Sequence, residues 1–170
     1  MKKQLKSQLN ISKVDSLCTP YPSKTFIDYF PDELKKTKYS LDIIMYQWKW
    51  DKWEPLSLAN KLTQTVIDLS RSGIKVRVLL NRDSPNSRLT VVNNETKKQL
   101  ENAGCAVKMG FASIATHAKM WLLDDDVVCL GSHNISKRSL SSNVECSVLI
   151  ESRQCNSELK RYFNLLWNAQ

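Results

Sequence analysis

Strand-like and helix-like segments alternate through the first two thirds of this 170-residue chain, and that order restricts the fold more than any other feature. Residues 40–48, 74–81 and 105–110 are short apolar runs typical of buried strands. Residues 56–73 and 89–104 place apolar side chains at helical spacing, and each segment ends in a glycine. Because strands joined through helices pair in parallel, the sequence predicts an α/β domain.

From residue 117 onwards the expected elements are shorter, and turns replace most of the helices. Residues 117–123 and 127–132 read as strands on either side of the acidic turn 124–126. Residues 143–151 read as a further strand, and residues 156–168 as a closing amphipathic helix. Strands this closely spaced pair antiparallel. The predicted fold is therefore α/β, with a mixed central β-sheet flanked by helices in a single layered domain.

The length is typical of one domain, preceded here by a short polar segment. We expect a polar lead-in over residues 1–20 and one catalytic domain over residues 21–170. No apolar stretch follows the basic start, and no run of about 18 apolar residues could span a membrane. The five cysteines form no CxxC pair, which favours reduced thiols. These features predict a cytoplasmic protein without a transmembrane segment.

The charge balance narrows the classes of partner. Lysine and arginine number 25 against 17 acidic residues, a formal net charge of +8. Such an excess suits a polyanionic partner, either nucleic acid or an acidic lipid surface. The remaining composition, with 42% hydrophobic and 25% charged residues, is that of an ordinary soluble protein, for which a basic balance need have no functional meaning.

The stretch HAKMWLLDDDVVCLGSHN, residues 117–134, carries the clearest chemistry. His117 and Lys119 are two residues apart on a predicted strand, so their side chains leave the same face. Ser132 and Asn134 have the same spacing at the end of the next strand. A lysine cation, a hydroxyl and an amide together can hold a phosphoryl group, and a neutral imidazole can attack its phosphorus.

Cleavage of a phosphodiester in this way also needs an acid for the leaving oxygen, and a second imidazole is suited to that role near neutral pH. The chain has two histidines. His133 alternates with Ser132 and Asn134, so on an extended strand it faces away from them. Either a second copy of the chain supplies another His117, or His133 acts within one chain. No metal ion and no cofactor are required.

These residues resemble the signature of the phospholipase D superfamily, HxKxxxxDxxxxxxGSxN, without a gap. Segments outside the motif, over roughly residues 20–168, resemble the small bacterial homodimeric endonucleases of that superfamily. The resemblance implies a phospholipase D-like fold. The matching positions are His117, Lys119, Asp124, Gly131, Ser132 and Asn134.

The resemblance also implies roles for individual residues. His117 would be the nucleophile and form a phosphohistidine intermediate, while Lys119, Ser132 and Asn134 would bind the phosphate. A downstream glutamate orients the imidazole in the family, and Glu145 lies where it is expected. Asp124 and Gly131 would be structural parts of the motif, Asp124 through an ion pair or a turn contact.

Only one copy of the HxK motif is present, as in family members that form homodimers with one active site at the two-fold axis. We therefore expect a homodimer in which His117 is supplied twice.

Two further groups of residues are candidates for substrate contact. The stretch WKWDKW, residues 48–53, interleaves tryptophans with lysines, which suits either base stacking or packing in the core. Lys137 and Arg138 directly follow the motif and are expected to line a substrate groove.

Taken together, these features predict a metal-independent phosphodiesterase, a nuclease that hydrolyses DNA or RNA. One alternative is a phosphodiesterase acting on a phospholipid of the cardiolipin type. Another is a non-catalytic nucleic-acid-binding module. Because no second domain is present to read bases, any sequence preference would come from a partner protein.

Overall fold

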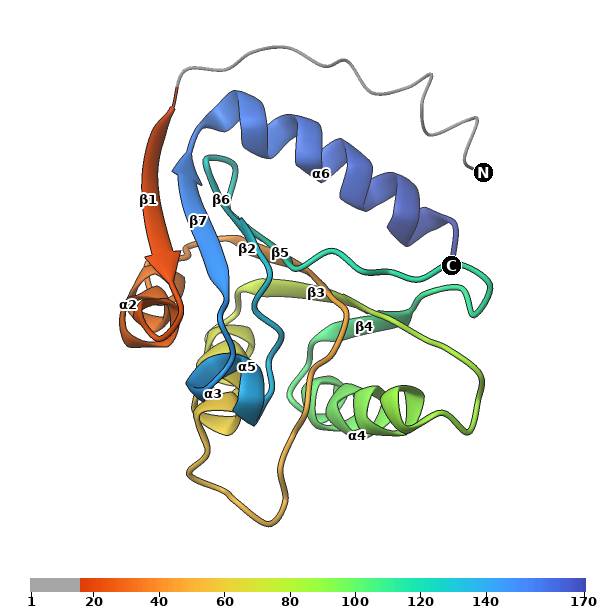
Figure 1. Ribbon diagram of the computed structural model, residues 1–170. Helices are drawn as coiled ribbons and strands as arrows, with labels where there is room; N and C mark the ends of the chain where they lie inside the picture. The colour runs from red at the N-terminus through yellow and green to blue at the C-terminus, as the bar shows by residue number, and fades with distance from the viewer. Residues whose placement is uncertain (1–15) are drawn as a thin grey trace.

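A computed structural model describes residues 16–170 as one seven-stranded sheet with helices on both faces (Figure 1). The expected α/β class with a mixed sheet is confirmed. The elements are β1 (Leu17–Pro22), α2 (Thr25–Leu34), β2 (Ser40–Met45), α3 (Leu58–Arg71), β3 (Lys75–Leu80), α4 (Arg88–Asn102), β4 (Ala106–Met109), β5 (Met120–Leu123), β6 (Val127–Gly131), α5 (Lys137–Ser141), β7 (Cys146–Glu151) and α6 (Arg153–Asn168).

The expected polar lead-in over residues 1–20 lies for the most part outside the described residues. The end of this segment is not a lead-in, because Leu17–Pro22 form the edge strand β1. This strand pairs antiparallel with β7, with Cys18 opposite Ile150 and Tyr21 opposite Ser147. The expected boundary between residues 20 and 21 therefore falls inside a strand of the sheet.

The sheet has the strand order β1-β7-β6-β5-β2-β3-β4. Strands β2, β3 and β4 are parallel and are joined through α3 and α4, whereas every other pair is antiparallel. It follows that the carboxyl ends of β2, β3, β4 and β6 share one edge with the amino ends of β5 and β7. Loops at this edge come from both halves of the chain.

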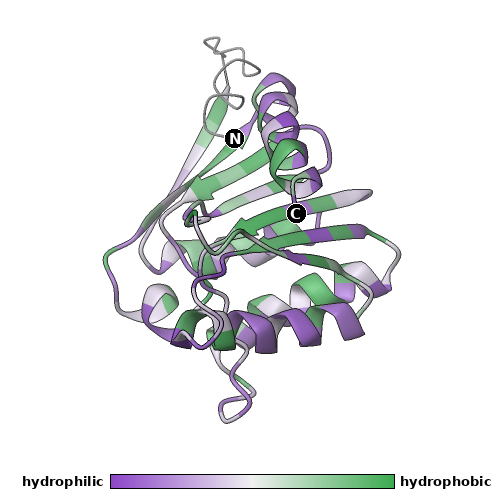
Figure 2. Cartoon of the chain, turned by 90° about the vertical axis from the view of Figure 1, so that its right-hand side faces the viewer, coloured by the Kyte–Doolittle hydropathy of each residue, from purple (hydrophilic) through white to green (hydrophobic). Residues whose placement is uncertain are grey.

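The two faces of the sheet pack against different helices (Figure 1). Alternate residues such as Ile44, Leu79 and Met120 pack with Phe163 of α6. The intervening residues, including Ile43 and Trp121, pack with the helices on the opposite face. Figure 2 shows hydrophobic residues along the strands and hydrophilic ones on the outer side of the helices. Across residues 16–170, every helix is too short or too polar to cross a lipid bilayer.

Asp124 holds the turn between β5 and β6 against the start of β2. Its carboxylate accepts hydrogen bonds from the backbone N–H groups of Lys38 at 2.9 Å, Tyr39 at 2.7 Å and Ser40 at 3.0 Å. Its own N–H donates to the Ser40 carbonyl at 2.8 Å, and its φ is +50°. The structure thus places this motif residue in a turn contact rather than an ion pair.

We expect Asp124→Ala to lower the free energy of unfolding by about 1–3 kcal/mol, because three backbone donors lose a charged acceptor. Urea titration of the variant and the wild type measures this difference. Asp124→Asn keeps one acceptor oxygen and tolerates a positive φ, so it should lose less. Equal stability of Asp124→Ala and the wild type would show that water replaces these contacts without loss.

Candidate active site

The motif residues converge at the edge where β5 begins and β6 ends. The strand expected from residue 117 begins only at Met120, so His117 and Lys119 lie in the segment that precedes it. The reason is topological. The chain must pass the ends of β3 and β2 to travel from β4 to β5, and a crossing segment cannot pair in the sheet. This segment is anchored where the Thr116 N–H donates to Asn81 Oδ1 at 2.6 Å.

His117 and Lys119 lie together despite the missing strand. Lys119 Nζ donates to the His117 carbonyl at 2.8 Å and lies 3.3 Å from Nδ1 and 3.4 Å from Nε2 of the imidazole. The ammonium group is buried, with the residue 7% exposed, whereas His117 is exposed. A cation therefore lies beneath an imidazole that solvent and substrate can reach.

Tyr46 completes this cluster, and the sequence reasoning missed it. Its ring centroid lies 4.5 Å from that of His117, and Lys119 Nζ lies 5.0 Å from the ring centroid. Tyr46 directly follows β2, at the carboxyl end of a strand, which is the position where α/β sheets gather their ligands. Its place near the end of a predicted strand was the one feature of the sequence that pointed to Tyr46.

Burial lowers the pKa of Lys119, and the charge of Glu145 acts in the opposite direction. The ammonium form is thus less favoured than in water until a further negative group approaches. A phosphate bound at this place would supply that negative charge.

Ser132 and Glu145 form the second part of the site. Ser132 Oγ donates to Glu145 Oε2 and accepts from the Cys146 N–H at 3.0 Å. Glu145 also accepts from Ser139 Oγ at 2.9 Å and Asn143 Nδ2 at 3.0 Å. Burial alone would raise the pKa of Glu145, but these hydrogen bonds from Ser132, Asn143 and Ser139 hold it below its ordinary value.

Glu145 is accordingly an ionised acceptor near the site. The contact expected between Glu145 and the His117 imidazole is not made within one chain, among the hydrogen bonds of residues 16–170. Within one chain the carboxylate accepts instead from Ser132, Ser139 and Asn143.

Asn134 presents a free amide group to the same edge. Its Oδ1 accepts from the Gln47 N–H at 3.1 Å, which fixes the side chain against the segment that follows β2. With the oxygen held in this way, the Nδ2 group has no acceptor within residues 16–170 and remains available to donate to a phosphate.

Gly131 is required by a close approach of two strands. A Cβ atom at this position would lie 2.5 Å from the Cys146 carbonyl oxygen and would overlap Ser147 Oγ. The absence of a side chain lets β6 and β7 approach, and Ser132 is held at the site as a consequence.

His133 lies just beyond the end of β6, with its side chain in the core. It is 1% exposed, its Nδ1 lies 2.7 Å from Ser147 Oγ, and its Nε2 lies 2.9 Å from the Ser23 carbonyl oxygen. The ring stacks on Phe26 at a centroid distance of 4.5 Å. A carbonyl only accepts, so Nε2 donates and Nδ1 accepts from the serine. His133 is therefore a structural residue, as its alternation with Ser132 indicated, and it does not face the site.

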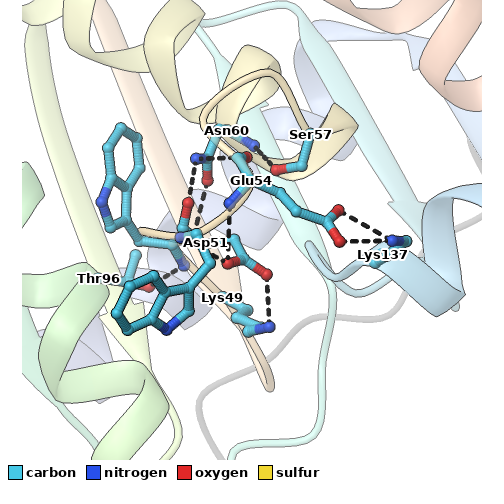
Figure 3. Close-up of polar contacts among 9 residues, drawn as sticks. Lys49, Asp51, Glu54, Ser57, Asn60, Thr96 and Lys137 are labelled. Atoms are coloured by element: carbon cyan, nitrogen blue, oxygen red, sulfur yellow. Dashed lines mark hydrogen bonds and ion pairs between the residues drawn. The ribbon is translucent and has the colours of Figure 1, made fainter.

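The predicted groove residues lie on α5, beside the site. Lys137 Nζ pairs with Glu54 at 2.7 and 2.9 Å (Figure 3), so this lysine joins α5 to a loop. Arg138 is exposed, and its guanidinium has no partner within the described residues. Of the tryptophans, Trp48 and Trp121 are buried and belong to the core.

An apolar cavity of about 210 Å³ opens beside the imidazole, and His117 forms part of its wall. The other lining residues include Phe111, Ile114, Ala118, Tyr162 and Leu166, so the segment before β5 and the end of α6 meet here.

The fold and this arrangement define a phospholipase D-like protein. A family model described as cardiolipin synthase, PLD-like domain, matches residues 31–167, and the chain belongs to this family, within the phospholipase D superfamily.

Known proteins similar to this chain include viral, animal and bacterial ones. The virion nicking-joining enzyme of monkeypox virus is 26% identical over 84% of this chain and 33% of its own length. The 5'-3' exonuclease PLD3 of Xenopus tropicalis is 28% identical over 79% of this chain and 28% of its own length. The chain thus spans about a third of such relatives. Among solved structures, the phospholipase D family member Nuc of Salmonella typhimurium is similar with a TM-score of 0.75, 15% identity, and coverage of 91% of this chain and 95% of its own.

The environment of His133 predicts a pH-dependent stability. Burial lowers its pKa, although the Ser23 carbonyl and the charge of Glu145 act against this. The unfolded chain takes up the proton near the ordinary pKa of about 6.5, and the folded chain only at lower pH. The stability contributed by neutral His133 is therefore complete above pH 6.5 and is lost as the pH falls towards the folded pKa.

Thermal unfolding between pH 5 and pH 8 measures this effect, whose slope is at most about 1.4 kcal/mol per pH unit for one group. His133→Gln should be less stable at pH 8 and should lose most of the dependence between pH 5 and pH 7. His117→Gln is the matched control, since it removes the exposed histidine and should keep the dependence. An unchanged slope in His133→Gln would assign the dependence to other groups.

Proposed function

We propose that this protein is a metal-independent phosphodiesterase. More specifically, we propose a nuclease that hydrolyses DNA or RNA through a phosphohistidine intermediate. The observation that carries the proposal is the exposed imidazole of His117 directly above the buried ammonium of Lys119. An imidazole placed in this way can reach a phosphorus atom whose negative oxygens are bound by the lysine.

The proposed reaction has two steps. A ring nitrogen of His117 forms a bond to phosphorus, the bond to the leaving oxygen breaks, and an acid donates a proton to that oxygen. A water molecule then attacks phosphorus, gives its proton to the same group acting as a base, and releases His117. Lys119, Ser132 and Asn134 would bind the phosphoryl oxygens in both steps. Glu145 is proposed to orient the imidazole of His117, the role that the resemblance to the superfamily implies.

The acid is proposed to be His117 of a second copy, in a homodimer with one site at the two-fold axis. The sequence contains only two histidines, and His133 is buried away from the site. The apolar cavity beside His117 supports this arrangement, because an unfilled apolar surface next to the nucleophile is suited to burial against another subunit. The symmetric contact would bring the two imidazoles together.

Nucleic acid is favoured over lipid as the substrate by the net charge of +8 and by relatives named as a nicking-joining enzyme and an exonuclease. The alternative of a cardiolipin-type substrate is supported by the description of the family. An assay can distinguish the two substrates, because nucleic acid would be cleaved in solution without vesicles or detergent.

We expect the wild type to cleave labelled single-stranded DNA, duplex DNA or RNA in the presence of EDTA. His117→Ala should reduce the rate by roughly a thousandfold or more, because the nucleophile is lost. Gel assays with all three polymers measure this, and circular dichroism checks that the variant is folded. Normal cleavage by folded His117→Ala protein would contradict the mechanism. Cleavage that disappears with EDTA would contradict metal independence.

Mixing the wild type with His117→Ala tests the shared site. If both copies of His117 are needed, mixed dimers are inactive, and an equal amount of the variant should lower wild-type activity to about half after subunit exchange. Sedimentation analysis reports the dimer independently. Activity that does not respond to the variant would show that one chain is sufficient.

A further inference from the structure

Residues 49–57 form a loop between Trp48 and α3, which we call the Trp53 loop. The loop extends beyond α3 and α4, away from the sheet (Figure 1). At its tip Trp53 and Leu56 are each 81% exposed. Neither side chain contributes much to the core, so the folding of this chain gives no reason for a tryptophan at this place.

The backbone of the loop is nevertheless held firmly by buried polar side chains. Asn60, which is 2% exposed, accepts from the Asp51 N–H at 2.9 Å and donates to the carbonyls of Asp51 at 2.8 Å and Glu54 at 3.2 Å. The Asp51 carboxylate in turn accepts from the N–H groups of Trp53 at 3.1 Å and Glu54 at 3.3 Å (Figure 3). The position of Trp53 is therefore set before any partner arrives.

The acidic side chains of the loop are paired with lysines, whereas one lysine of the loop has no acidic partner within residues 16–170. Both carboxylates are paired with lysines, Asp51 with Lys49 at 2.6 Å and Glu54 with Lys137 at 2.7 Å (Figure 3). Lys52 has no such pair, and its Nζ lies 5.2 Å from the centroid of the Trp53 ring. The exposed tip therefore presents an aromatic face together with an uncompensated cation.

The loop is also continuous with the phosphate-binding edge. Lys49 N–H donates to the Ile135 carbonyl at 2.8 Å, next to Asn134, and Glu54 pairs with Lys137 at the start of α5. The Trp53 loop is thus fixed to the segment that carries Asn134. A polymer bound at His117 could reach Trp53 along this segment, passing the unpaired Arg138.

We propose that Trp53, together with Lys52, is a stacking platform for a base of single-stranded nucleic acid whose backbone is bound at His117. This rests on the proposed nuclease function and specifies the form of its substrate. An indole face stacks on any base, and the adjacent lysine binds the backbone phosphate. Bases of a duplex are already stacked on one another, so the platform selects single strands. Insertion into a bilayer is less favoured, because it depends on a larger apolar area than this tip supplies.

The test measures binding of a fluorescent single-stranded oligonucleotide in the His117→Ala background, so that the ligand stays intact. Trp53→Ala should raise Kd roughly five- to a hundredfold, the range expected for one stacked base. Trp53→Phe should retain most of the affinity. Leu56→Ala is the matched control, since it removes an equally exposed apolar side chain from the same loop and should leave Kd unchanged.

An abasic oligonucleotide of the same length separates stacking from charge. It keeps the phosphates and lacks the bases, so Trp53→Ala should have little effect on its Kd, and likewise on that of a blunt duplex. Equal losses for the normal and the abasic strand would overturn the proposal. So would equal losses in Trp53→Ala and Leu56→Ala together with binding to phosphatidylglycerol vesicles, which would assign the tip to a membrane surface.

Because this assay needs no turnover, its result is separable from that of the proposed function. A Trp53-dependent affinity for bases in a protein that cleaves no polymer would support the platform and contradict the nuclease. Cleavage of DNA or RNA with identical Kd values for Trp53→Ala and Leu56→Ala would support the nuclease and overturn the platform.

Discussion

The antiparallel entry of β5 beside β2 is the constraint on which the rest of the site depends. In the register of this pair, Ile44 lies opposite Met120 and Leu41 opposite Leu123. Because β2 runs towards the site and β5 runs away from it, the residues that precede β5 meet those that follow β2. His117 and Lys119 therefore lie beside Tyr46. At the other end of the pair, the Asp124 carboxylate accepts from the N–H groups of Tyr39 and Ser40, where β2 begins. The register is therefore fixed far from the candidate site.

Each side chain proposed to bind phosphate is oriented by a polar partner. Asn134 is held through Gln47, Ser132 through Glu145, and Lys119 through the carbonyl of His117. These contacts leave donors on Lys119 and Asn134 free for the edge of the sheet, whereas the single O–H of Ser132 is given to Glu145. Donors that are fixed before the substrate binds need no reorganisation when negative charge develops on the phosphoryl oxygens.

The sequence predicted the central strands, the helices α3, α4 and α6, and the motif, because these depend on periodicity and on spacing along the chain. Other features depend on where distant segments meet. The strand β1 contains two prolines and little apolar periodicity, and its place is determined by the exposed edge of β7. The strand β5 begins three residues after the predicted start at residue 117, because the segment that crosses from β4 cannot pair in the sheet. Tyr46 and the partners of Glu145 could not be predicted for the same reason, because each contact joins separate loops.

The position of Trp48 links the candidate active site to the Trp53 loop. Its ring is buried and its Nε1 donates to Thr63 Oγ1 at 2.8 Å, while its backbone forms a bridge with Ile135. The residues before it therefore contact Asn134, and those after it are directed away from the sheet towards Trp53. One buried indole thus determines the direction of the segment that carries the exposed one. A substitution that loosened Trp48 would disturb the proposed phosphate site and the loop together. A change at Trp53 is confined to the tip, and the contribution of the tip can therefore be measured by itself.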